Sequence, residues 1–198
     1  DNLLRAVLNK ECGLLEKGHV LTHIAVAEIP GMQRLLFFTD AAVIPYPTTE
    51  QFHAQLGYIA DTFRSVTGND CPRVALTHCT EKVSEKFPLT LSYEELKKEA
   101  REGAFGSIEV DGPMDVKTAC DAESGAIKGI ASPVVGNADI LIFPDIEAGN
   151  TFYKAITLFA KATVAGMLAG TTAPVVVTSR ADTVESKFYS LATACMKA

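Results

Sequence analysis

The chain has 198 residues, of which 47% are apolar and 21% charged, so it is long and apolar enough to bury a core. Its net charge of −6 argues against a general nucleic-acid binder, whose surface should be basic. No apolar run is long enough to span a membrane. The five cysteines include no C-x-x-C pair, so we expect reduced thiols in a cytoplasmic chain.

The first third of the chain predicts a helix, a hairpin and a second helix. Residues 1–15 have the apolar spacing of an amphipathic helix. Residues 20–30 and 34–40 read as two strands joined by a proline-glycine turn, which predicts an antiparallel hairpin. The next helix is expected to begin at Thr48 or Thr49 and to end near Gly68.

From residue 73 onward, short apolar strands alternate with helices. The predicted strands are residues 73–79, 107–110, 138–144 and 174–179. The predicted helices are a segment opened by a Ser92/Glu95 capping box and closed at Gly103, a short one through Val116 and Ala119, and residues 151–168 and 183–196. Such alternation is typical of a mostly parallel sheet covered by helices on both faces. We therefore predict one α/β domain over residues 1–198, with an antiparallel hairpin attached.

Polar residues follow each predicted strand of this second part. In open parallel sheets, ligands bind beyond the carboxyl ends of the strands. The four ends carry Thr77 to Thr80, Asp111-Gly112-Pro113, Pro144 to Asn150, and Thr178-Ser179-Arg180. Their convergence on one edge predicts a site there, although Asp111-Gly112-Pro113 alone is also an ordinary turn sequence.

Ser179 and Arg180 stand between a predicted strand and a predicted helix. Backbone N–H groups at a helix start, with a guanidinium beside them, suit a phosphate. Capping of the helix by Asp182 with Glu185 is an alternative use of this segment. Capping does not account for an arginine beside a strand end, so we expect Arg180 to belong to a site.

Gly149 and Asn150 stand at the predicted start of the helix over residues 151–168. Glycine permits close backbone approach and asparagine offers a donor and an acceptor, but plain helix-start punctuation explains the pair equally well. Lys154 either reaches a phosphate or extends to solvent. His19 and His23 are four residues apart on a strand, which is poor zinc geometry, and we predict no metal site.

Five segments together resemble the phosphate acetyl/butyryl transferase family, and most of all its phosphate butyryltransferase (branched-chain phosphotransacylase) type. They are DGP (111–113), SPVVG (132–136), PDIEAGN (144–150), Tyr153-Lys154 and TSRAD (178–182). The resemblance implies transfer of a short acyl group between coenzyme A and phosphate, with coenzyme A as a substrate and no metal or prosthetic group. It also implies an isocitrate/isopropylmalate dehydrogenase-like fold and a homodimer.

The same resemblance implies the site residues. Ser179 and Arg180 match the motif that holds phosphate and the charge developing on the acyl group. The resemblance leaves the general base unassigned. By position, Asp145, which we count among the catalytic residues, and Glu147 are the nearest candidates, with Asp182 behind them. The residues predicted to bind substrate are Asp111, Gly112, Pro113, Ser132, Glu147, Gly149, Asn150 and Lys154.

Three departures from the family pattern qualify this prediction. Position 158 is leucine where acetyl-type members carry an arginine, and position 186 is serine where they carry an aspartate, which favours the butyryl type. Family chains also carry a further amino-terminal α/β segment, so we expect this sequence to lack that part. The alternative to an active acyltransferase is a truncated, non-catalytic lobe or a dimerisation module of such an enzyme. A metal-dependent dehydrogenase of related fold is a weaker one, since the necessary aspartate cluster is not evident.

Overall fold

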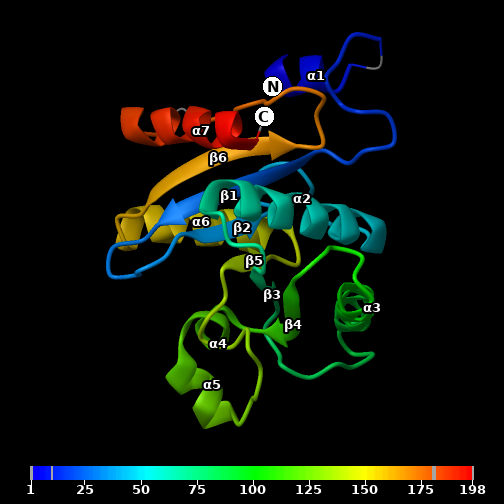
Figure 1. The fold of residues 1–198 in the computed structure, drawn as a ribbon, viewed down its shortest axis with the longest axis vertical. Helices are drawn as coiled ribbons and strands as arrows, with labels where there is room; N and C mark the ends of the chain where they lie inside the picture. The colour runs from blue at the N-terminus through cyan, green and yellow to red at the C-terminus, as the bar shows by residue number, and fades with distance from the viewer. Residues whose placement is uncertain (1, 10, 180–181, 198) are drawn as a thin grey trace.

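A computed structural model describes residues 2–9, 11–179 and 182–197 of the chain (Figure 1). The elements in chain order are α1 (Asn2–Val7), β1 (Thr22–Glu28), β2 (Leu36–Thr39), α2 (Thr49–Thr67), β3 (Arg73–Thr77), α3 (Leu89–Arg101), β4 (Glu109–Met114), α4 (Val116–Cys120), α5 (Ala122–Lys128), β5 (Ile140–Ile142), α6 (Ile146–Phe159), β6 (Thr163–Ala169) and α7 (Val184–Lys197). Among the described residues, no helix is long and apolar enough to cross a membrane.

The strands form one mixed sheet in the order β4-β3-β5-β2-β1-β6. β1 is antiparallel to both of its neighbours, β2 and β6, whereas the pairs β2–β5, β5–β3 and β3–β4 are parallel. Five strands therefore run in one direction and β1 alone runs against them. The predicted α/β class, with its antiparallel hairpin of β1 and β2, is confirmed.

Helices cover both faces of this sheet, with α2 and α6 on opposite sides (Figure 1). Adjacent strand residues point to opposite faces, so Phe37 joins the core under α2 with Leu56, while Phe38 joins the core under α6 with Ile156. All four side chains are buried. The two cores fix α2 and α6 against the same strand, β2, at the centre of the molecule.

The prediction of α2 is confirmed at both ends. The Thr48 hydroxyl accepts from the Gln51 N–H at 3.3 Å, and the Gln51 side chain accepts from the Thr48 N–H at 2.9 Å, which completes a capping box. At the other end Gly68 adopts φ +70°, a left-handed conformation that costs glycine little and stops the helix.

The predicted helix over residues 151–168 is wrong, because this stretch contains the end of one helix and all but the last residue of a strand. α6 begins at Ile146 and ends at Phe159, and Lys161 then turns the chain with φ 55°. β6 follows and pairs with β1 along its full length, from Thr163 opposite Glu28 to Ala169 opposite Thr22. Apolar residues face both sides of β6, so its sequence does not show the alternation expected of a strand.

The predicted strand over residues 174–179 is also wrong, since only Val175 makes a bridge, to Leu168. The segment nevertheless runs beside β6, to which Val175 is bridged, and it brings Ser179 to the same hollow as Val164 and Gly166 of that strand.

Three smaller boundaries also differ from prediction. α3 begins at Leu89 without a side-chain cap, and Ser92, inside the helix, accepts a hydrogen bond from Thr49. α1 ends at Val7, because the Asn9 side chain accepts the N–H groups of residues 11 and 12 and turns the chain. Asp111-Gly112-Pro113 lies inside β4 rather than in a turn after it.

Candidate active site

Two hollows lie at the edge of the sheet where β2, β3 and β5 end. The site cavity has a volume of about 220 Å³, and its chemically functional lining residues are His23, Asn150, Tyr153, Lys154, Ser179 and Asp182. The β3 cavity has a volume of about 600 Å³, and its polar lining includes His78, Cys79, Asp115 and Asp145. The first turns of α6 lie between them, because Asp145 lines the β3 cavity and Asn150 the site cavity.

The start of α6 is fixed to the turn that follows β2. Asp145 caps the helix by accepting the Ala148 N–H at 2.8 Å. Gly149 packs so closely that a Cβ there would lie 2.1 Å from the Asp40 carbonyl oxygen. The Asn150 side chain donates to the Ala41 carbonyl at 3.0 Å. The close approach required at Gly149 and the amide at Asn150 therefore position the helix that carries Lys154.

Asp182 joins the two sides of the site cavity. One carboxylate oxygen accepts from the Tyr153 hydroxyl at 2.7 Å, and the other accepts from the Ser179 N–H at 2.6 Å. Burial raises the pKa of Tyr153, and the hydrogen bond to Asp182 raises it further, so the phenol stays protonated as a donor. The capping interpretation of Asp182 is wrong: Thr183 accepts the N–H of Ser186 at the start of α7.

Lys154 supplies positive charge at the cavity wall. Its ammonium nitrogen lies 4.2 Å from the centre of the Tyr153 ring, a cation–π contact. The side chain is exposed and, within the described part of the chain, forms no ion pair with a carboxylate. An ammonium in this position suits a phosphate oxygen of a ligand in the cavity.

His23 is a lining residue that the sequence analysis considered only as a zinc ligand and did not place at the site. It lies in β1 with 7% of its surface exposed, and its Nδ1 has no hydrogen-bond partner among the described residues. Burial lowers the pKa of His23 below its ordinary value of 6.5. The carboxylates of Asp40 and Asp182 oppose this shift, and the ammonium of Lys154 adds to it. The imidazole is thus neutral near pH 7 and able to accept a proton.

The structure brings three of the predicted site residues together and separates the others. Ser179, Asn150 and Lys154 line the site cavity, and Gly149 lies beneath it against Asp40. Asp145 lines the β3 cavity instead.

The remaining predicted residues lie elsewhere or are not described. Glu147 is exposed and accepts the Tyr46 hydroxyl at 2.6 Å. Asp111 and Ser132 line a third hollow, while Gly112 and Pro113 are buried in β4. Arg180 falls outside the described residues. The roles assigned to all these residues stay predictions.

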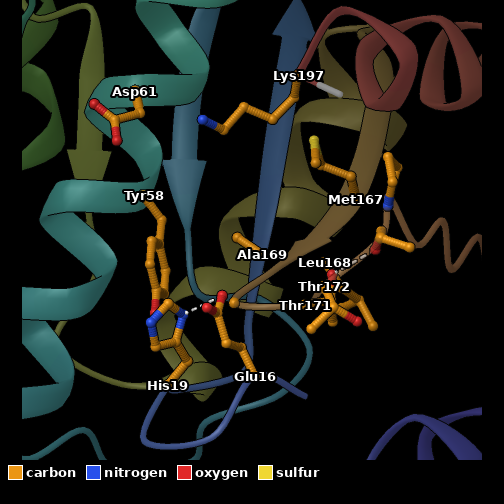
Figure 2. A pocket seen from close by; sticks show the side chains of 13 residues that line it. Glu16, His19, Tyr58, Asp61, Met167, Leu168, Ala169, Thr171, Thr172 and Lys197 are labelled. Carbon is orange, nitrogen blue, oxygen red and sulfur yellow. Dashed lines mark hydrogen bonds and ion pairs between the residues drawn. The ribbon is translucent and has the colours of Figure 1, made fainter. Parts of the chain in front are cut away.

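A further cavity lies on the opposite face of β6, between α2 and the end of α7 (Figure 2). It measures about 440 Å³, and Figure 2 shows His19 beside Tyr58, with an ion pair between His19 and Glu16 at 3.2 Å. None of the predicted site residues lines it, so it is not the candidate site. In the described parts of the chain, no group of three or more His, Cys, Asp and Glu side chains is placed to hold a metal ion.

Comparison with known proteins identifies the family. A family model described as "Phosphate acetyl/butaryl transferase" matches residues 1–195. The chain is 41% identical over 192 residues to the probable phosphate butyryltransferase of Bacillus subtilis, covering 97% of this chain and 64% of the relative. It is 39% identical over 193 residues to the phosphate acetyltransferase of Thermotoga maritima, with 96% and 64% covered.

Among solved structures, the branched-chain phosphotransacylase of Enterococcus faecalis superimposes with a TM-score of 0.85 at 34% identity, over 98% of this chain and 68% of that one. The chain therefore belongs to the phosphate acetyl/butyryl transferase family, as the sequence motifs predicted. It spans 64% of the length of these two curated relatives.

Proposed function

We propose that the chain takes part in the transfer of a short-chain acyl group between coenzyme A and phosphate: acyl-CoA and phosphate give acyl phosphate and coenzyme A. The observation that carries the proposal is the site cavity, where Ser179, Lys154 and Asn150 meet at the edge of the sheet in a member of this family. Hydrogen-bond donors and a cation around a small hollow suit a phosphoryl group.

Direct transfer between the two substrates needs no covalent enzyme intermediate. In the direction that forms acyl-CoA, the reverse of the reaction as written above, the thiolate of coenzyme A attacks the acyl carbon, the bond from that carbon to the phosphate oxygen breaks, and phosphate leaves with the electron pair. The protein then has to position both substrates and stabilise the charge on the acyl oxygen. Ser179 and Arg180 are proposed for the acyl oxygen and phosphate, and Lys154 for the phosphate. Asp145, at the neighbouring cavity, remains a candidate base.

The finer properties of the chain are part of the same proposal. We propose a butyryl or branched-chain acyl group, since residues 158 and 186 differ from the acetyl-type pattern and a branched-chain phosphotransacylase is among the similar structures. We also propose an isocitrate/isopropylmalate dehydrogenase-like fold for residues 1–198 as one lobe, no cofactor besides coenzyme A as substrate, a homodimer, and a cytoplasmic location.

The test is to incubate the chain with butyryl-CoA and phosphate and to follow free thiol with a colorimetric reagent. We expect thiol release that depends on phosphate, and a loss of about 10²-fold in kcat for Ser179→Ala, the size typical of one lost donor to a developing charge. Ser65→Ala is the matched control, because Ser65 is exposed on α2. A folded chain that releases no thiol from butyryl-CoA or acetyl-CoA would refute transfer by this chain and favour a non-catalytic lobe.

A further inference from the structure

A buried imidazole, which has no hydrogen-bond partner in the described part of the chain, lines the site cavity. His23 is 93% buried, and neither of its ring nitrogens has a hydrogen bond among the described residues. Buried polar groups in folded proteins are nearly always hydrogen-bonded, so an exception beside a cavity calls for an explanation. A polar ligand atom in the cavity can reach Nε2 and not Nδ1, which is enclosed by protein atoms.

The position of His23 is fixed by its backbone. The carboxylate of Asp40 accepts the His23 N–H at 3.1 Å, and the Thr39 hydroxyl donates to the His23 carbonyl at 2.8 Å. These bonds hold the start of β1 against the end of β2. The imidazole is therefore carried by two buried strands rather than by a loop, which favours precise placement of a reacting group.

The ring edge that carries Nε2 lies over Gly166 of β6. A Cβ at Gly166 would come within 2.7 Å of Nε2, and Gly166 itself lines the site cavity. Nδ1, by contrast, is enclosed by protein atoms. The imidazole fills the place that a side chain at Gly166 would take, and the ring meets a ligand in the cavity through its Nε2 edge.

We infer that His23 is the proton acceptor of the acyl transfer, a role that rests on the function proposed above. Nε2 takes the proton of the coenzyme A thiol as the sulfur bonds to the acyl carbon and phosphate departs with the electrons of the broken carbon–oxygen bond. In the reverse direction, the imidazolium returns this proton to the sulfur as the thiolate leaves the acyl carbon. Atoms and charge balance with no further reactant.

The charged groups around the ring agree with this assignment. Asp182 already accepts two hydrogen bonds, from Tyr153 and from the Ser179 N–H, so its oxygens are occupied. Asp40 is occupied by the turn after β2. Its negative charge and that of Asp182 both favour protonation of His23, so the imidazolium formed during transfer would be stabilised while the resting ring stays neutral.

Kinetics of His23→Gln provide the first test. For transfer from butyryl phosphate to coenzyme A, the direction in which His23 accepts the thiol proton, we expect kcat to fall by about 10²–10⁴-fold, with the acidic limb of its pH profile lost and KM for butyryl phosphate changed less than about threefold. His53→Gln is the matched control, because His53 is exposed on α2 and pairs with Glu99 at 2.7 Å, away from the cavity. Thermal unfolding of both variants checks that each is folded. His23→Asn provides a second variant if the glutamine variant is unstable.

The second test does not depend on turnover. Ring signals of His23, identified by their absence from the NMR spectrum of His23→Gln, are followed while inorganic phosphate and then coenzyme A are added. We expect these signals to move, and those of His53 to stay in place.

The outcomes separate the two proposals. Turnover that survives His23→Gln within about threefold overturns the inference and leaves the proposed function standing. A wild-type chain without turnover refutes the proposed function. Signals of His23 that phosphate and coenzyme A leave in place would then refute contact between ligand and imidazole as well, whereas signals that move would support that contact.

Discussion

Replacing Asp40 by asparagine should destabilise the fold next to the site. Asp40 stands at the end of β2 with 2% of its surface exposed. One carboxylate oxygen accepts the N–H groups of Ala42 at 2.7 Å and Val43 at 2.9 Å. The other accepts the Thr22 hydroxyl at 2.8 Å and the N–H groups of His23 at 3.1 Å and Ile44 at 3.2 Å. Five donors thus converge on one side chain.

The cost of Asp40→Asn follows from this geometry. An asparagine keeps one oxygen and places an amide nitrogen where the other oxygen was. In either orientation two backbone N–H groups face that nitrogen and lose their acceptor, while the Thr22 hydroxyl can rotate and accept. Each unpaired buried donor costs about 1–3 kcal/mol, so the free energy of unfolding should fall by about 2–6 kcal/mol.

Urea unfolding followed by circular dichroism measures this change. Asp61→Asn is the matched control, because Asp61 is 57% exposed in a surface ion pair with Arg64 and should change stability by less than about 1 kcal/mol. Equal unfolding free energies for the Asp40 and Asp61 variants would refute the reasoning, since they would mean that water or a rearranged turn satisfies the donors without the carboxylate.

Three further changes test the packing around the cavity. Gly149→Ala places a methyl group 2.1 Å from the Asp40 carbonyl oxygen and should lower the free energy of unfolding, measured in urea, by about 1–3 kcal/mol. In the control Gly57→Ala, in α2, the nearest atom would lie 3.9 Å from the methyl group, and the free energy of unfolding should rise by about 0.5–1 kcal/mol. Gly166→Ala should cost about 1–3 kcal/mol in the wild type but less than about 0.5 kcal/mol in a His23→Ala background, and equal costs in this double-mutant cycle would contradict the contact with Nε2. Burial lowers the pKa of His23 below 6.5, so at mildly acidic pH the unfolded state binds a proton that the folded state does not. The free energy of unfolding should therefore fall as the pH is lowered from about 7 to about 5, and it should fall less in His23→Gln.

The sequence predicted most elements because their local signals agree with their surroundings. α2 has a capping box, an apolar stripe and a terminal glycine, and all three are used in the structure. β3 and β5 are short apolar runs at the centre of the sheet, where both faces are covered. In such segments local preference and tertiary contact favour the same conformation.

β6 was missed because nothing local distinguishes it from a buried helix. Ala165 and Met167 face the core under α2, while Val164 faces the core under α6. A strand that is apolar on both faces has no visible period, and joined to the apolar end of α6 it reads as one long helix. What decides its conformation is pairing with β1, which lies far away along the chain. Lys161, at φ 55°, makes the break without glycine or proline to signal it.

Only part of the lining of the candidate site was predicted from the sequence, and the reason is again that tertiary contacts are not visible locally. The ends of β3, β4 and β5 share an edge, as expected of parallel strands, but the first turns of α6 divide that edge into separate hollows. Asp145 and Asn150 are close in sequence and belong to different hollows. Ser179 lines the site cavity from a segment that is not a strand, so the strand-end argument that first drew attention to it started from a wrongly predicted element, and its role stays a prediction.

The direction of β1 explains why His23 was not predicted to lie at the site. Ligands in open α/β sheets are expected beyond the carboxyl ends of parallel strands, which draws attention to residues that follow a strand. β1 runs against its neighbours, so its first residues lie at the edge where β2 ends, and Thr22 and His23 both contact Asp40 there. A reversed strand thus contributes its start, not its end, to such a site. A polar residue at the beginning of a hairpin strand in a mostly parallel sheet should therefore be weighed as a site candidate along with those at strand ends.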